Sequence, residues 1–61
     1  MSEFEVGDRV EKWTGDYVWS GIVCAVFMTP DRNIRIVVAH PVQHGYVLHI
    51  YSPANLRHEP P

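Results

Sequence analysis

The stretch from Gly21 to Thr29 constrains the fold more than any other part of this sequence, because it is apolar on both alternating faces. Successive side chains of an extended strand point to opposite sides. One face would carry Ile22, Cys24, Val26 and Met28, and the other Val23, Ala25, Phe27 and Thr29. A strand in a one-sided antiparallel sheet alternates apolar and polar residues instead. We therefore expect a strand that bends across a small barrel, or one whose outer face is covered by another chain.

The chain has 61 residues and a single cysteine, Cys24. A domain of this size buries only ~60% of the surface that its unfolded chain exposes, so small scaffolds usually need a disulfide, a metal or a partner subunit. One cysteine cannot form an intrachain disulfide. We therefore expect the chain to complete its fold as a homo-oligomer. A lone thiol in an apolar run also fits a reducing compartment, and we expect Cys24 to be a small buried hydrophobe.

Short runs of Val, Ile, Tyr, Phe and Trp, separated by Gly, Pro, Asp and Asn, predict an all-β protein. The predicted strands are Arg9–Trp13, Gly21–Thr29, Ile34–Ala39, Tyr46–Tyr51 and Leu56–His58. The predicted connections are a long loop at 14–20 with Tyr17 and Trp19 at its tip, a turn at 30–33 in which Asn33 tolerates a positive φ, a loop at 40–45, and a helical turn at 52–55 capped by Ser52. This order is that of a small five-stranded SH3-like barrel, a single domain over residues 1–61 with an ordered core of about 5–58.

Charge and hydropathy argue against several classes of partner. The formal net charge is −2, and Lys12 and the arginines are scattered, whereas a mostly electrostatic grip on DNA or RNA needs clustered basic residues. We therefore expect no generic nucleic-acid binding. The first residues are polar and acidic, unlike a signal peptide, and the apolar stretch Ile22–Met28 is too short to span a bilayer. These features predict a cytoplasmic protein without membrane contact.

The histidines invite a metal hypothesis, but their spacings match no compact Zn or Fe motif, and we expect no metal site. His40 and His44 fall in one predicted loop, where we expect both to be solvated. The serines have no evident neighbouring base, which argues against covalent hydrolytic catalysis.

Two longer stretches match a known family. The first is Gly7-Asp8-Arg9-Val10-Glu11-Lys12, followed by Gly15, Trp19, Gly21 and Ile22-Val23, and the second is Val47-Leu48-His49-Ile50-Tyr51, followed by Pro53-Ala54 and Leu56. Together they cover most of residues 4 to 57, and they resemble the type B (plasmid-type, trimethoprim-insensitive) dihydrofolate reductases. The opening and the Leu-His-Ile-Tyr-Ser ending also resemble small SH3-like proteins from phages and proteobacterial genomes.

The resemblance to the reductases implies a homotetramer of SH3-like barrels around a central pore, in which NADPH reduces dihydrofolate. Carried onto this chain, Lys12 would attract the cofactor phosphates and the folate tail. Leu48 would line the pore, and Ile50 would offer backbone groups to the nicotinamide and the pterin. His49 and Tyr51 would be the catalytic positions as well as parts of the cofactor site, with Tyr51 supplying a wall and a hydroxyl.

His49 stands where the reductase family has Gln. A neutral imidazole donates and accepts like an amide, but it becomes a cation near its pKa. Symmetry-related imidazoles in one pore would repel each other when charged unless an anionic ligand is present. A ring of histidines therefore suits a polyanionic ligand better than it suits the positioning of hydride transfer.

Three classes of function follow from these observations. The first is an NADPH-dependent, dihydrofolate reductase-like enzyme. The second is a non-enzymatic binder of a nucleotide or folate ligand, for example a phage-type sponge that sequesters a cyclic nucleotide signal. The third is an SH3-like protein-interaction module that uses its aromatic residues as a peptide groove.

Overall fold

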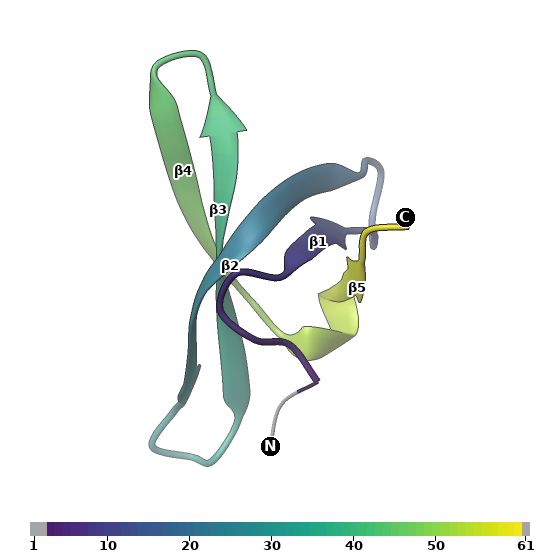
Figure 1. Ribbon diagram of the computed structural model, residues 1–61. Coiled ribbons are helices and arrows are strands. Elements are labelled where there is room, and N and C mark those ends of the chain that lie inside the picture. Colours follow the sequence, from purple (N-terminus) through teal and green to yellow (C-terminus); the bar gives the residue numbers. More distant parts are fainter. Residues whose placement is uncertain (1–2, 61) are drawn as a thin grey trace.

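The computed structural model describes residues 3–60, which form a five-stranded antiparallel sheet (Figure 1). Its elements are β1 (Arg9–Lys12), β2 (Trp19–Met28), β3 (Ile34–Val42), β4 (Gly45–Tyr51), the 3-10 helix η1 (Pro53–Asn55) and β5 (Leu56–His58). The strand order is β4-β3-β2-β1-β5. The all-β prediction is confirmed, and the sheet is compatible with a small barrel-like fold. Within the described residues, no helix is long and apolar enough to cross a membrane.

Strand β2 bends, so that Val23 before the bend and Val26 after it both face the core, while Ile22, Phe27 and Met28 stay exposed. Figure 1 shows β2 passing from beside β3 to beside β1. The register between β2 and β3 shifts between Val23 and Ala25, as in a β-bulge, and a bulge bends a strand and increases its twist. Val23 therefore packs opposite Val38, whereas Val26 lies opposite Ile36. The simple alternation predicted from the sequence was wrong beyond this point, because the bulge exchanges the two faces.

Cys24 lies at the bulge and is exposed. Its Sγ is 3.5 Å from the carbonyl oxygen of Val37. The expectation of a buried cysteine was therefore wrong, because Cys24 follows the buried Val23 and so points to the opposite, exposed face.

Two predicted loops are shorter in the structure. Strand β2 begins at Trp19, and β3 continues through His40 to Val42. The connection to β4 is the two-residue turn between Val42 and Gly45, which pair with each other. Pro41 suggested a loop, but it lies beyond the segment of β3 that pairs with β2, where a missing backbone N–H is tolerated.

Two smaller predictions about turns also need correction. In the turn before β3, the positive φ of 67° belongs to Arg32 rather than to Asn33. Ser52 does occupy the N-cap position of η1, but its side chain makes no capping hydrogen bond.

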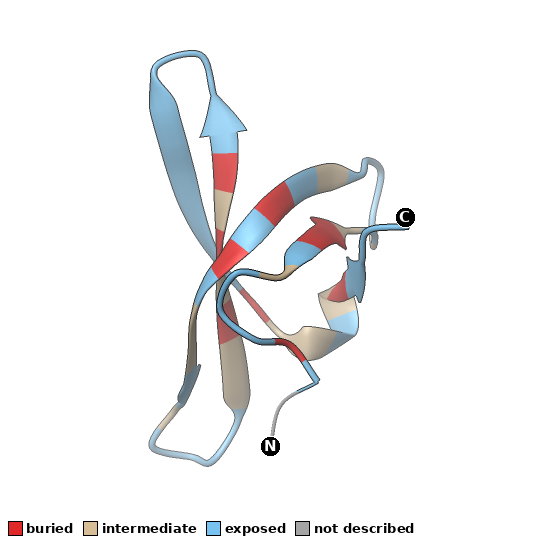
Figure 2. Ribbon diagram, viewed as in Figure 1, coloured by how far each residue is buried: buried red, intermediate tan, exposed pale blue. Residues whose placement is uncertain are grey.

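The core is small and lies where β1, β5 and the bent β2 meet the middle of β3 (Figure 2). Its buried apolar residues are Phe4, Val10, Val23, Ile36, Val38, Tyr51 and Leu56. By contrast, every residue from Pro41 to Ile50 is exposed. The far end of the β3–β4 hairpin therefore projects beyond the core with both faces open.

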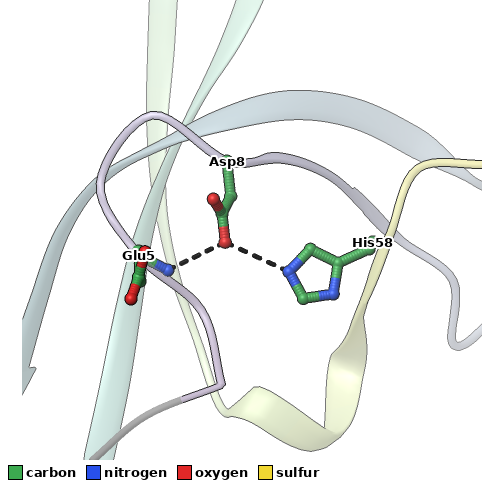
Figure 3. A network of polar contacts seen from close by, with 3 residues as sticks. All are labelled: Glu5, Asp8 and His58. Atoms are coloured by element: carbon green, nitrogen blue, oxygen red, sulfur yellow. Dashed lines mark hydrogen bonds and ion pairs between the residues drawn. The ribbon is translucent and has the colours of Figure 1, made fainter. Parts of the chain in front are cut away.

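The segment before β1 is fastened to β5 by a polar network (Figure 3). The Asp8 carboxylate accepts hydrogen bonds from the Glu5 backbone N–H at 2.9 Å and from Nε2 of His58 at 3.1 Å. Phe4 is buried and stacks on the His58 ring with 4.8 Å between the ring centroids. The hydrogen bond from Glu5 and the contact with His58 hold the pKa of Asp8 below its usual value. This network closes one end of the core.

Gly21 allows a close approach between β2 and β3, and its replacement tests that packing. A Cβ at this position would lie 2.5 Å from Cγ1 of Val38 and 2.7 Å from the carbonyl oxygen of Ala39. We expect Gly21→Ala to lower the free energy of unfolding by ~1–3 kcal/mol, the usual cost of overpacking. Urea unfolding followed by tryptophan fluorescence would measure the change. Ser20→Ala, at an exposed neighbouring position, is the control, and equal midpoints for the two variants would contradict the close approach.

Candidate binding site

Four aromatic side chains from three strands form a cluster beside the core. Trp19 from β2 stacks on His40 from β3, with ring centroids 3.9 Å apart and planes 8° from parallel. The His49 ring from β4 is nearly perpendicular to that of Trp19, with centroids 5.3 Å apart, and its centroid lies 5.7 Å from that of His40 and 5.8 Å from that of Tyr51. We call Trp19, His40, His49 and Tyr51 the aromatic cluster.

Hydrogen bonds fix the protonation pattern of His40 at the centre of the cluster. Its Nδ1 lies 2.8 Å from the carbonyl oxygen of Ser20, and its Nε2 lies 2.7 Å from the hydroxyl oxygen of Tyr51. A carbonyl oxygen can only accept, so Nδ1 carries the proton and donates it. The neutral ring then has its lone pair on Nε2, and the Tyr51 hydroxyl donates to it. The two bonds join β2, β3 and β4 through one side chain.

Burial shifts the pKa values of both His40 and Tyr51. His40 has no exposed surface, and this desolvation lowers the pKa of its imidazole, with a smaller contribution in the same direction from the charge of nearby His49. The hydrogen bond to Ser20 opposes the shift. Burial also raises the pKa of the Tyr51 phenol, with a further contribution from Tyr17. His40 is therefore held neutral, and Tyr51 is held protonated.

A cation borders the cluster. Lys12 on β1 pairs with Trp19 on β2, which places both side chains on the same face of the sheet. The Lys12 ammonium donates to the Tyr17 carbonyl oxygen at 3.2 Å and lies 3.6 Å from the centroid of the Tyr17 ring. The arrangement can therefore contact a flat ring through Trp19 and His49, and an anionic group through Lys12.

The structure separates the site residues predicted from the sequence into two sets. Lys12, His49 and Tyr51 lie at the aromatic cluster. Leu48 and Ile50 alternate with His49 along β4 and so point to the opposite face, where they are 61% and 62% exposed. Leu48 and Ile50 therefore adjoin the aromatic cluster only through their backbone atoms.

Sequence reasoning missed three residues of this site. Trp19 and Tyr17 were assigned to a loop tip, and His40 was assigned to a solvated loop. The prediction for His40 was wrong: the residue lies within β3 and is buried. The available signal was Gly21, because a glycine inside a strand often marks a close approach, and a Cβ there would lie 3.0 Å from Nδ1 of His40.

The cluster is an open surface rather than an enclosed cavity. No pocket is found among the described residues of a single chain. Within the same residues, no group of three or more His, Cys, Asp or Glu side chains could hold a metal ion. Comparison of the chain with protein-family models, curated proteins and solved structures finds no significant match.

The buried state of His40 predicts a pH-dependent stability. Because its pKa is lower in the folded protein than the usual 6.5, the unfolded chain binds the proton more readily. The stabilisation is fully present above about pH 6.5 and decreases as the pH falls from there towards the folded pKa, by at most ~1.4 kcal/mol per pH unit. Urea unfolding between pH 8 and pH 5 would measure this trend.

Asp8 does not interfere with this measurement, because its lowered pKa affects stability only near and below its usual value of 3.8. A nitrogen-15 NMR titration gives the matching site-specific readout. The His40 ring should stay mostly neutral, with the proton on Nδ1, at pH 6.5, the usual pKa of a histidine. A titration midpoint of this ring at or above pH 6.5 would contradict this assignment.

Proposed function

We propose that this chain assembles with copies of itself and binds a planar, anionic ligand of the nucleotide class at the aromatic cluster. The observation that carries the proposal is the pairing of Lys12 with Trp19, whose ring in turn contacts that of His49. Aromatic rings offer stacking surfaces to a base or a nicotinamide, and an ammonium group attracts a phosphate. The fold we propose is an SH3-like barrel, and the assembly a homotetramer, as the resemblance to type B dihydrofolate reductases implies.

The edge strand β4 supports self-assembly. It lies at one end of the sheet, and its register with β3 is regular along its whole length. Edge strands that remain unpaired usually carry charges, proline or bulges. Between Ile36 and Leu56 the chain has no Asp, Glu, Lys or Arg, and Tyr46, Leu48 and Ile50 expose more than half of their surface. A second copy of the chain is the proposed partner for this edge.

Two candidate activities share this site. A bound NADPH would supply a hydride, and Lys12, Trp19 and His49 fit its phosphates and flat rings by their chemistry. Tyr51 favours binding without turnover, because its hydroxyl proton is donated to His40 inside the chain. A nucleotide-sequestering protein is therefore the first candidate, and a weak dihydrofolate reductase is the second. We place either function in the reducing cytoplasm, which suits the exposed free thiol of Cys24.

Leu48→Lys tests the proposed assembly. A lysine at this exposed apolar position would place like charges together wherever two β4 strands meet, so the variant should shift the protein to a monomer. Light scattering coupled to size-exclusion chromatography measures the mass. Val6→Lys makes the same change at a position that is 68% exposed and precedes β1, and it should leave the mass unchanged. A wild-type protein that is itself monomeric would remove the pore hypothesis and favour the protein-interaction module.

Lys12→Gln tests the proposed ligand class. Removing the ammonium should weaken NADPH binding about tenfold, the loss expected for one charge-assisted hydrogen bond, and should reduce its dependence on salt. Fluorescence titration of the wild type and the variant measures both effects. The loss of NADPH absorbance in the presence of dihydrofolate then separates the candidates: tight binding without turnover selects sequestration.

Equal affinity of wild type and Lys12→Gln at all salt concentrations would remove Lys12 from the site.

His49→Gln introduces the glutamine that the type B reductases carry at this position, and it should raise any reductase activity.

A further inference from the structure

The single lysine of the chain is held in place by the loop that follows β1. Lys12 Nζ donates to the carbonyl oxygen of Tyr17 at 3.2 Å and lies 3.6 Å from the centroid of the same residue's ring. Both the backbone and the side chain of Tyr17 therefore contact one ammonium group. Tyr17 itself is 56% exposed and contributes nothing to the core.

Gly15 allows the loop to fold back over the lysine. Its φ of +84° lies in the region that side chains rarely adopt, and a Cβ there would come within 3.1 Å of Lys12 Nζ. The loop thus surrounds the end of the Lys12 side chain from two sides. An ordinary surface lysine samples many rotamers, whereas this one has a defined position before any ligand arrives.

The remaining hydrogen-bonding capacity of Lys12 is small and directed. An ammonium group has three donors. One is used by the Tyr17 carbonyl, and the ring face attracts the charge on a second side. What remains is a single donor, which suits one anionic oxygen. A group that is ordered in advance loses less conformational freedom when the ligand binds.

The position of this ammonium connects it to the aromatic cluster. Lys12 pairs with Trp19, whose ring contacts both His40 and His49. The loop, the ammonium and the cluster therefore belong to one surface.

We propose that Tyr17 is a positioning residue that holds the Lys12 ammonium beside the aromatic cluster, where it donates to one anionic oxygen of a phosphate or carboxylate. The inference rests on the proposed function in one respect, the anionic character of the ligand. It extends that function by assigning a role to a loop residue that is not among those that resemble the reductases.

Acylation of Lys12 tests the contact without any ligand. N-hydroxysuccinimidyl acetate modifies amines preferentially, and in this chain these are Lys12 and the N-terminus. Peptide mass spectrometry resolves the two, and the N-terminus serves as the internal reference. Lys12 should react about two- to fivefold faster in Tyr17→Leu than in the wild type, as expected for the loss of an exposed cation–π contact. Tyr17→Phe keeps the ring and should restore the slow rate.

Val18→Ala is the matched control in the same loop, since Val18 is 54% exposed and does not contact Lys12 through any described hydrogen bond or ring. It should react like the wild type. The positioning role is overturned if Lys12 reacts at the same rate in Tyr17→Leu and in the wild type, and circular dichroism shows that these two proteins are folded.

A second measurement separates this inference from the proposed function. Inorganic pyrophosphate and NADPH are each added before acylation of the wild type. The positioning role is supported if both anions protect Lys12 from acylation. Their affinity for Tyr17→Leu should then be about two- to fivefold lower than for the wild type, and their affinity for Tyr17→Phe should equal that for the wild type. Protection by pyrophosphate alone supports it too, while removing NADPH as the ligand. If neither anion protects Lys12, or if both protect wild type and Tyr17→Leu equally, the inference is overturned.

Discussion

The imidazole of His40 joins three strands, and the remaining structure depends on it. The backbone ladder between β2 and β3 runs from the Met28–Ile34 pair to the Ile22–Ala39 pair and ends there. There the His40 side chain donates to the carbonyl of Ser20 and accepts from Tyr51. Hydrogen bonds of the His40 side chain thus connect the strands where the backbone hydrogen bonds end. They can do so only because Gly21 leaves room for the ring.

The same contact organises the candidate site. Trp19 lies parallel to His40, so the buried ring provides the platform that orients the half-exposed indole. The position of Lys12 also depends on this arrangement, because its pairing with Trp19 brings β1 to the aromatic cluster. The packing of the core and the geometry of the surface therefore share one set of residues.

The strand positions could be predicted from the sequence, and the contacts at the site could not. β-branched and aromatic runs between turn residues located all five strands, because those runs reflect local preference and burial. The bulge near Cys24 depends on pairing with β3, which no local pattern encodes. His40 was misplaced because Pro41 and the polar residues after it are typical of a loop. Lys12, His49 and Tyr51 were selected through a resemblance, whereas Trp19 and Tyr17 became visible only once β1 and β2 were paired.

The two histidines of the cluster have opposite roles although their rings are only 5.7 Å apart. His40 is buried with both nitrogens satisfied, while His49 is exposed on the edge strand. A positive charge on His49 makes a second charge on His40 more costly, since His49 lowers the pKa of His40. Protonation at the surface therefore reinforces the neutral state of the inner ring. The contact that holds β2, β3 and β4 together is thus kept free of charge even when His49 is protonated.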